Sequence, residues 1–234
     1  MSDSSPLRIH TLQTVRTARY AVRGAELSSA RRIWFALHGY GQVAPSFLKP
    51  FTDVVPADTS VVAAEGLNRF YREMPRPDGS HMQQVGATWM TRENREDDIA
   101  DTLTWLGRLQ AHVLSEAPLG AQTPVGVLAF SQGVAAAIRW IATGTVPVSC
   151  LVLWAGGMPH DVDFGVLRQA LRNTRIVLVL GIRDPFITES RRAEMEKAIA
   201  AIDRPVELMT FDGEHHLDPH VLGTLLEALP HHAS

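Results

Sequence analysis

The stretch Gly126-Val127-Leu128-Ala129-Phe130-Ser131-Gln132-Gly133-Val134-Ala135-Ala136-Ala137-Ile138 runs from an apolar segment through a serine into a segment of small residues. The apolar segment predicts a buried strand and the alanine-rich segment a helix, so Ser131 would lie at a tight turn between them. Small residues two positions before and after a serine let strand and helix approach closely while the hydroxyl stays accessible. We predict a nucleophilic Ser131, with an ordinary strand-to-helix turn as the alternative. Ala129 stands where the usual Gly-x-Ser-x-Gly pattern has glycine.

Short apolar runs alternate with longer amphipathic runs on both sides of this turn, which is typical of a parallel sheet with helices on both faces. Six strands are expected, at residues 32–37, 59–64, 126–130, 148–154, 176–180 and 206–211. Four helices are expected, at residues 97–114, 131–143, 188–202 and 218–229. Residues 66–96 form the longest irregular stretch, and we expect either a long loop near the site or short elements hidden within it. The pattern predicts a single α/β domain over residues 1–234.

Composition narrows the class of protein. The chain has 234 residues, of which 45% are hydrophobic and 20% charged, as in one ordinary globular domain. The formal net charge of -3 argues against nucleic acid as a partner. No apolar run approaches the ~18 residues of a membrane span, so no stable membrane insertion is expected. The lone Cys150 lies in an apolar run and is predicted to be a buried thiol, and with no leader pattern at the N-terminus the expected location is cytoplasmic.

A second glycine-containing turn follows the expected strand 32–37, in His38-Gly39-Tyr40-Gly41-Gln42. Glycines let the backbone bend so that an N–H points at a substrate oxygen. Hydrolases with a strand–serine–helix turn combine such an N–H with the N–H that follows the nucleophile. We therefore predict an oxyanion hole formed by Tyr40 and Gln132, with a simple glycine turn as the alternative.

Two further side chains complete a candidate catalytic set. Asp184 and His215 each follow an expected strand, at the edge of the sheet where open α/β folds place their sites. The order Ser131, Asp184, His215 is the order in which α/β folds with this turn carry a triad. Imidazole can take the serine proton, and a carboxylate can hold the imidazole in the required tautomer. The adjacent His216 is poorly separated from His215 by these arguments.

A metal site is an alternative use of the same segment, because imidazole and carboxylate groups cluster near the C-terminus. The candidate ligands are Glu214, His215, His216 and His220, with His231 and His232 further on. We predict neither a metal nor an organic cofactor.

The chain resembles the phospholipase/carboxylesterase family of α/β-hydrolases, which also contains the acyl-protein thioesterases. The segments that carry the resemblance are Leu37-His38-Gly39-Tyr40-Gly41, Phe130-Ser131-Gln132-Gly133, Gly181-Ile182-Arg183-Asp184-Pro185 and Gly213-Glu214-His215. It implies an α/β-hydrolase fold with a mostly parallel central sheet, helices on both faces and no separate cap domain. It also implies that His215 rather than His216 is the base, although Glu214 replaces a glycine of the family pattern.

The predicted activity is carboxylesterase-type hydrolysis of a small-molecule acyl ester through an acyl-enzyme intermediate. A lysophospholipase or acyl thioesterase is the alternative among enzymes, and a catalytically silent hydrolase-fold binding protein is the alternative of another class. Assembly as a homodimer is left open.

Trp89, Met90 and Phe186 are the predicted substrate-binding residues. Arginines of the stretch 66–96, Arg69 and Arg72 among them, are expected either to bind an anionic head group or to pair with acids of the same loop.

Overall fold

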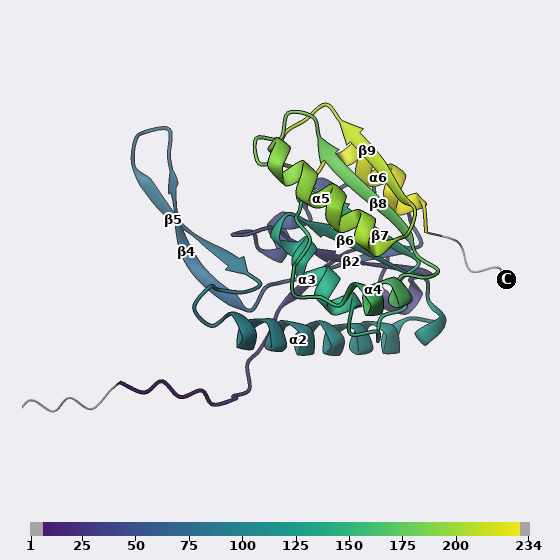
Figure 1. The fold of residues 1–234 in the computed structure, drawn as a ribbon, viewed down its shortest axis with the longest axis horizontal. Coiled ribbons are helices and arrows are strands. Elements are labelled where there is room, and N and C mark those ends of the chain that lie inside the picture. The colour runs from purple at the N-terminus through teal and green to yellow at the C-terminus, as the bar shows by residue number, and fades with distance from the viewer. Residues whose placement is uncertain (1–6, 230–234) are drawn as a thin grey trace, which may run out of the picture.

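A seven-stranded sheet with the order β1-β3-β2-β6-β7-β8-β9 forms the centre of the computed structural model, which describes residues 7–229 (Figure 1). The strands are β1 (Tyr20–Gly24), β2 (Arg32–Leu37), β3 (Thr59–Ala64), β6 (Val125–Phe130), β7 (Cys150–Trp154), β8 (Arg175–Gly181) and β9 (Val206–Phe211). Only β1 runs antiparallel to its neighbour, and the other pairs are parallel. The six predicted strands and the mostly parallel sheet are confirmed. The short edge strand β1 was not predicted, because none of its five residues is fully buried.

Helices cover both faces of the sheet, so every residue of β2, β3, β6 and β7 is buried. One face packs against α2 (Arg95–Glu116), α3 (Gln132–Ile141), α4 (Phe164–Ala170) and α5 (Glu189–Ile202), and the other against α1 (Ala44–Phe47) and α6 (Pro219–Glu227). Single 3-10 turns occur at Leu27–Ser29, Lys49–Phe51 and Gly120–Gln122. Strands covered on both sides need continuous apolar sequence, which is why these four were readable from the chain.

The predicted helix starts agree with the observed capping. Thr188 accepts a hydrogen bond from the Arg191 N–H at the start of α5, and Asp218 accepts two at the start of α6. Cys150 is buried as predicted, and its burial raises the pKa of the thiol to about 11. Within residues 7–229, no helix is both long enough and apolar enough to cross a membrane.

The stretch 66–96 is not a long loop. It contains two eight-residue strands, β4 (Asn68–Pro75) and β5 (His81–Thr88), which pair antiparallel as a hairpin. In Figure 1 this hairpin projects away from the central sheet. Its strands escaped prediction because most of their residues stay exposed or half-buried, so they carry no apolar run of the kind seen in the sheet.

Candidate active site

Ser131 occupies a strained turn between β6 and α3. Its backbone has φ +53° and ψ -118°, a combination that residues other than glycine rarely adopt and that is typical of functional sites. The Ser131 N–H donates to the Trp154 carbonyl at 2.8 Å. A Cβ atom on Gly133 would lie 2.4 Å from the Leu37 carbonyl oxygen, and one on Gly156 2.3 Å from that of Ser131. The turn is therefore as tight as the sequence predicted.

The structure brings Ser131, His215 and Asp184 together in one hydrogen-bonded row. His215 Nε2 lies 2.9 Å from Ser131 Oγ, and His215 Nδ1 lies 2.6 Å from Asp184 Oδ2. The side chain of Asp184 is fully buried, and its other oxygen accepts the Phe186 N–H at 2.8 Å. The imidazole packs against the rings of Phe130 and Phe186, with centroid distances of 4.8 and 4.7 Å. With Nδ1–H donating to the carboxylate, Nε2 is free to accept the serine proton.

The loops that carry the acid and the base are joined directly. The Arg183 N–H donates to the Gly213 carbonyl at 3.0 Å, and the Arg183 guanidinium forms an ion pair with Asp212. A Cβ atom on Gly181 would lie 2.5 Å from the Gly213 carbonyl oxygen. This contact holds the segment before Asp184 against the segment before His215.

His216 lies outside the row, although it is adjacent to His215 in sequence. It is exposed, and its ring packs edge-on against Phe211 at 5.4 Å. Among residues 7–229, no group of three or more His, Cys, Asp or Glu side chains is arranged to hold a metal ion. His231 and His232, the last two candidate ligands, lie outside the described residues.

The backbone N–H groups of Tyr40 and Gln132, like that of Gly133, have no hydrogen-bond partner among residues 7–229. Their neighbours are engaged: the Gly39 N–H donates to Gln42 Oε1 at 2.8 Å, and the Gly41 N–H donates to the Ala87 carbonyl at 2.8 Å. The two amides predicted to form an oxyanion hole are thus unpaired within the described residues, and both residues line the cavity that contains Ser131.

A cavity of about 660 Å³ opens next to these groups, within the range of small-molecule sites. Its lining includes Ser131, His215, Tyr40 and Gln132. Its apolar lining includes Met158, Phe186, Ile187 and Met195, the last of these from α5. The site therefore combines the polar row and the free amides with an apolar wall.

The sequence profile of the FSH1 family, described as serine hydrolase, matches residues 29–219. The chain belongs to the FSH1 serine hydrolase family. The match covers the segments of Ser131, Asp184 and His215, and it confirms the predicted resemblance to serine hydrolases at the level of the family.

Solved structures of related folds come from several organisms. A phospholipase/carboxylesterase from Dyadobacter fermentans is 14% identical, with 92% of this chain and 98% of that chain covered and a TM-score of 0.61. Acyl-protein thioesterase 2 of Zea mays is 16% identical, with 90% of this chain and 97% of that chain covered and a TM-score of 0.62. A carboxylesterase from Mesorhizobium loti is 17% identical, with 90% of this chain and 95% of that chain covered and a TM-score of 0.63. At these identities the likeness shows the fold alone, and it confirms the predicted α/β-hydrolase fold. No curated protein matches the sequence.

Of the three substrate-binding residues predicted in this family member, only Phe186 lines the cavity. Trp89 is buried in the core, where its indole stacks on the His38 ring at 4.7 Å and donates to the His38 carbonyl at 2.7 Å. Met90 directs its sulfur toward Arg139, at 4.0 Å. Neither residue lines this cavity, so the substrate-binding role predicted for Trp89 and Met90 is not carried into the proposal below.

The wall residues Met158, Ile187 and Met195 were missed. Met158 follows the carboxyl end of β7, and this position relative to the sheet was the one signal that could have indicated it. Met195 lies within α5, in a sequence dominated by charged residues, and nothing local distinguishes it from a core residue. Its place in the cavity depends on how α5 packs over the sheet.

His38, which follows β2, is fully buried. We predict from its burial that the protein loses stability in acid. The His38 Nδ1–H donates to the Gly39 carbonyl at 2.8 Å, and its Nε2 accepts the Gly66 N–H at 3.0 Å, so the ring is neutral. Burial lowers the pKa of His38 from 6.5 to about 4, against the smaller opposing effects of the Gly39 hydrogen bond and the Glu65 charge. Between these pH values the unfolded chain binds a proton that the folded chain does not, so stability falls as pH falls.

We expect the free energy of unfolding to drop by on the order of 3 kcal/mol across this window from His38 alone. Denaturant unfolding at a series of pH values measures the slope. His38→Gln, which cannot titrate, should flatten it, and an equally steep slope in that variant would contradict the assignment.

Proposed function

We propose that this chain hydrolyses carboxylic acyl esters, with Ser131 as nucleophile, His215 as general base and Asp184 as the group that orients His215. The observation that carries the proposal is the continuous row of hydrogen bonds from Ser131 Oγ through His215 to the buried Asp184 carboxylate, at the edge of a cavity. A serine hydroxyl is a weak nucleophile at neutral pH, and such a row activates it.

The reaction proceeds in two steps. Ser131 Oγ attacks the ester carbonyl carbon while its proton passes to His215 Nε2, and the carbonyl oxygen becomes an oxyanion that accepts hydrogen bonds from the Tyr40 and Gln132 N–H groups. His215 then gives the proton to the leaving alcohol, and an acyl group remains on Ser131. A water molecule repeats the attack on the acyl-enzyme, with His215 again taking and returning the proton, and the carboxylic acid leaves. This sequence uses no metal and no organic cofactor.

The acyl group is proposed to lie along the apolar wall formed by Met158, Ile187 and Met195. These residues line the same cavity as Ser131, and burying a hydrocarbon chain against them removes apolar surface from water. The proposed partner is accordingly a small acyl ester.

The arginines of the hairpin favour a neutral ester over a lysophospholipid, which is an ester with an anionic phosphate in its head group. Arg69 is paired with the buried Glu65 carboxylate at 2.9 Å, and Arg72 donates to the Gly41 carbonyl at 2.6 Å. Because both guanidinium groups are engaged within the protein, the hypothesis that they bind a head group is not carried forward.

Labelling with a fluorophosphonate probe tests the proposal. We expect covalent labelling of the native chain at Ser131 and none of Ser131→Ala, because the probe reacts with activated serines. Turnover of a p-nitrophenyl ester, a thioester of equal acyl length and a lysophospholipid then ranks the substrates; the thioester is included because one structural neighbour is named an acyl-protein thioesterase. Absence of labelling in the folded native chain would instead indicate a silent binding protein. The cytoplasmic location stays a prediction.

A further inference from the structure

The β4–β5 hairpin contacts the turn that carries the Tyr40 amide. Two backbone hydrogen bonds join this turn to β5: the Gly41 N–H donates to the Ala87 carbonyl at 2.8 Å, and the Ala87 N–H donates to the Gln42 carbonyl at 3.1 Å. From β4, Arg72 donates through a terminal nitrogen to the Gly41 carbonyl at 2.6 Å. Both strands of the hairpin therefore hold the residue that follows Tyr40.

The turn that carries Tyr40, called the Tyr40 turn below, packs tightly against the hairpin. Gly41 has φ +73°, and a Cβ atom there would lie 2.8 Å from an Arg72 nitrogen. A Cβ atom on Gly86 would lie 2.8 Å from the Gly41 carbonyl oxygen. The Tyr40 ring in addition packs on Phe70 of β4, with centroids 5.2 Å apart. The Tyr40 turn thus rests on the hairpin through both backbone and side-chain contacts.

The end of β5 also holds Gln132, the residue that follows Ser131. The Gln132 side-chain amide donates from Nε2 to Thr88 Oγ1 at 2.7 Å and accepts the Trp89 N–H at 3.4 Å. Thr88 Oγ1 donates onward to the Met90 carbonyl at 3.0 Å. Tyr40 and Gln132 are consequently both in contact with the same hairpin, although they belong to segments far apart in the chain.

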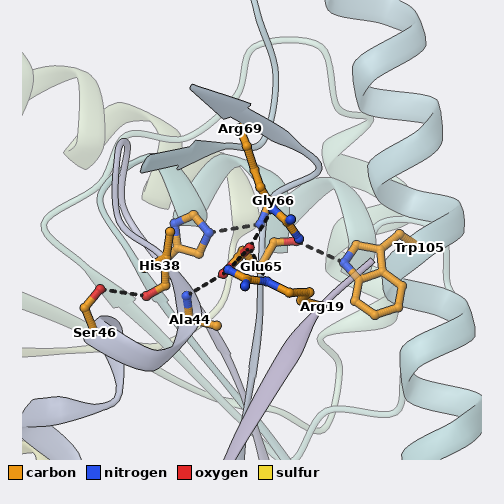
Figure 2. A network of polar contacts seen from close by, with 9 residues as sticks. Arg19, His38, Ala44, Ser46, Glu65, Gly66, Arg69 and Trp105 are labelled. Carbon is orange, nitrogen blue, oxygen red and sulfur yellow. Dashed lines mark hydrogen bonds and ion pairs between the residues drawn. The ribbon is translucent and has the colours of Figure 1, made fainter. Parts of the chain in front are cut away.

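The base of the hairpin is anchored by Glu65, which follows β3 and is 1% exposed (Figure 2). Its carboxylate forms ion pairs with Arg19 and with Arg69 of β4, and it accepts a hydrogen bond from the Ala44 N–H at the start of α1. Charged donors around a buried carboxylate make the arrangement costly to disrupt. Glu65 therefore joins the start of the hairpin to the far end of the Tyr40 turn.

We propose that the β4–β5 hairpin sets the positions of the Tyr40 and Gln132 amides relative to Ser131, with Arg72 and Thr88 as positioning residues. The inference rests on the proposed ester hydrolysis. Donors that are fixed in advance stabilise the charge that develops in the transition state, and a displaced donor lowers kcat more than it weakens substrate binding.

The experiment compares Arg72→Ala and Thr88→Val with Arg76→Ala, using a neutral p-nitrophenyl ester. Arg76 lies just beyond β4 and is exposed, so its variant removes the same charge near the hairpin without touching the Tyr40 turn. We expect Arg72→Ala and Thr88→Val each to lower kcat by about 10-fold to 100-fold with KM close to the native value. Arg76→Ala should leave both constants unchanged, and Thr88→Ser, which keeps the hydroxyl, should recover most of kcat.

A second readout separates positioning from general damage. A boronic acid that forms a tetrahedral adduct with Ser131 should lose affinity in parallel with kcat, because the adduct uses the same two amides. The inference would be overturned if kcat and boronic acid affinity in Arg72→Ala and Thr88→Val fell no more than in Arg76→Ala. An increase in KM with kcat unchanged would also overturn it. If Thr88→Val does not fold, Arg72→Ala against Arg76→Ala decides. A native chain that neither turns over the ester nor reacts with the fluorophosphonate would overturn the proposed function and this inference with it.

Discussion

Ser131→Ala is expected to fold normally and to lose nearly all ester turnover, on the order of 10⁶-fold in kcat by analogy with other triads. The backbone conformation at residue 131, with φ +53°, is equally demanding for alanine and serine, so the exchange removes the nucleophile with little change in the fold. The measurement is kcat for a p-nitrophenyl ester, together with thermal unfolding of both proteins.

Ser29→Ala provides a matched control, because the Ser29 hydroxyl is exposed and bonds to the nearby Glu26 carbonyl. We expect native kcat from this variant. If purified Ser131→Ala retained turnover near the native rate, the nucleophile would have to be a different group.

The second large effect separates two adjacent histidines. His215→Ala should reduce kcat about as severely as Ser131→Ala, because members of a triad act as a unit. His216→Ala should keep most of the activity, since His216 is exposed and its ring packs on Phe211 rather than on Ser131 or Asp184. Both variants are measured with the same ester and at several pH values.

The same pair of variants tests the metal alternative. Under the proposed mechanism, EDTA leaves native turnover unchanged. A severe loss in His216→Ala with activity preserved in His215→Ala would move the base by one residue, and turnover abolished by EDTA would return Glu214, His215, His216 and His220 to consideration as ligands.

Much of the candidate site was predictable because each of its polar side chains lies shortly after a strand of the parallel sheet. Ser131 follows β6, Asp184 lies three residues beyond β8, and His215 four beyond β9. In a parallel sheet the carboxyl ends of the strands meet at one edge, so chain order and strand position were enough to bring the three together. The turn at Ser131 was readable for the same reason, since a buried strand, a small residue and a helix leave little choice of local geometry.

The sequence by itself determined the parallel sheet, the strained serine turn, the row of Ser131, His215 and Asp184, and the two segments that carry free amides. These features depend on residues close together in the chain or on strand order. Only the tertiary structure decided that 66–96 is a hairpin, that Arg69 and Arg72 are engaged by Glu65 and Gly41, and that Trp89 contacts His38 while α5 supplies a wall of the cavity. An arginine or tryptophan reads alike in sequence whether it meets solvent, substrate or protein. Arg72 and Trp89 find their partners, Gly41 and His38, in distant segments, so only the packing of those segments decides what each side chain contacts.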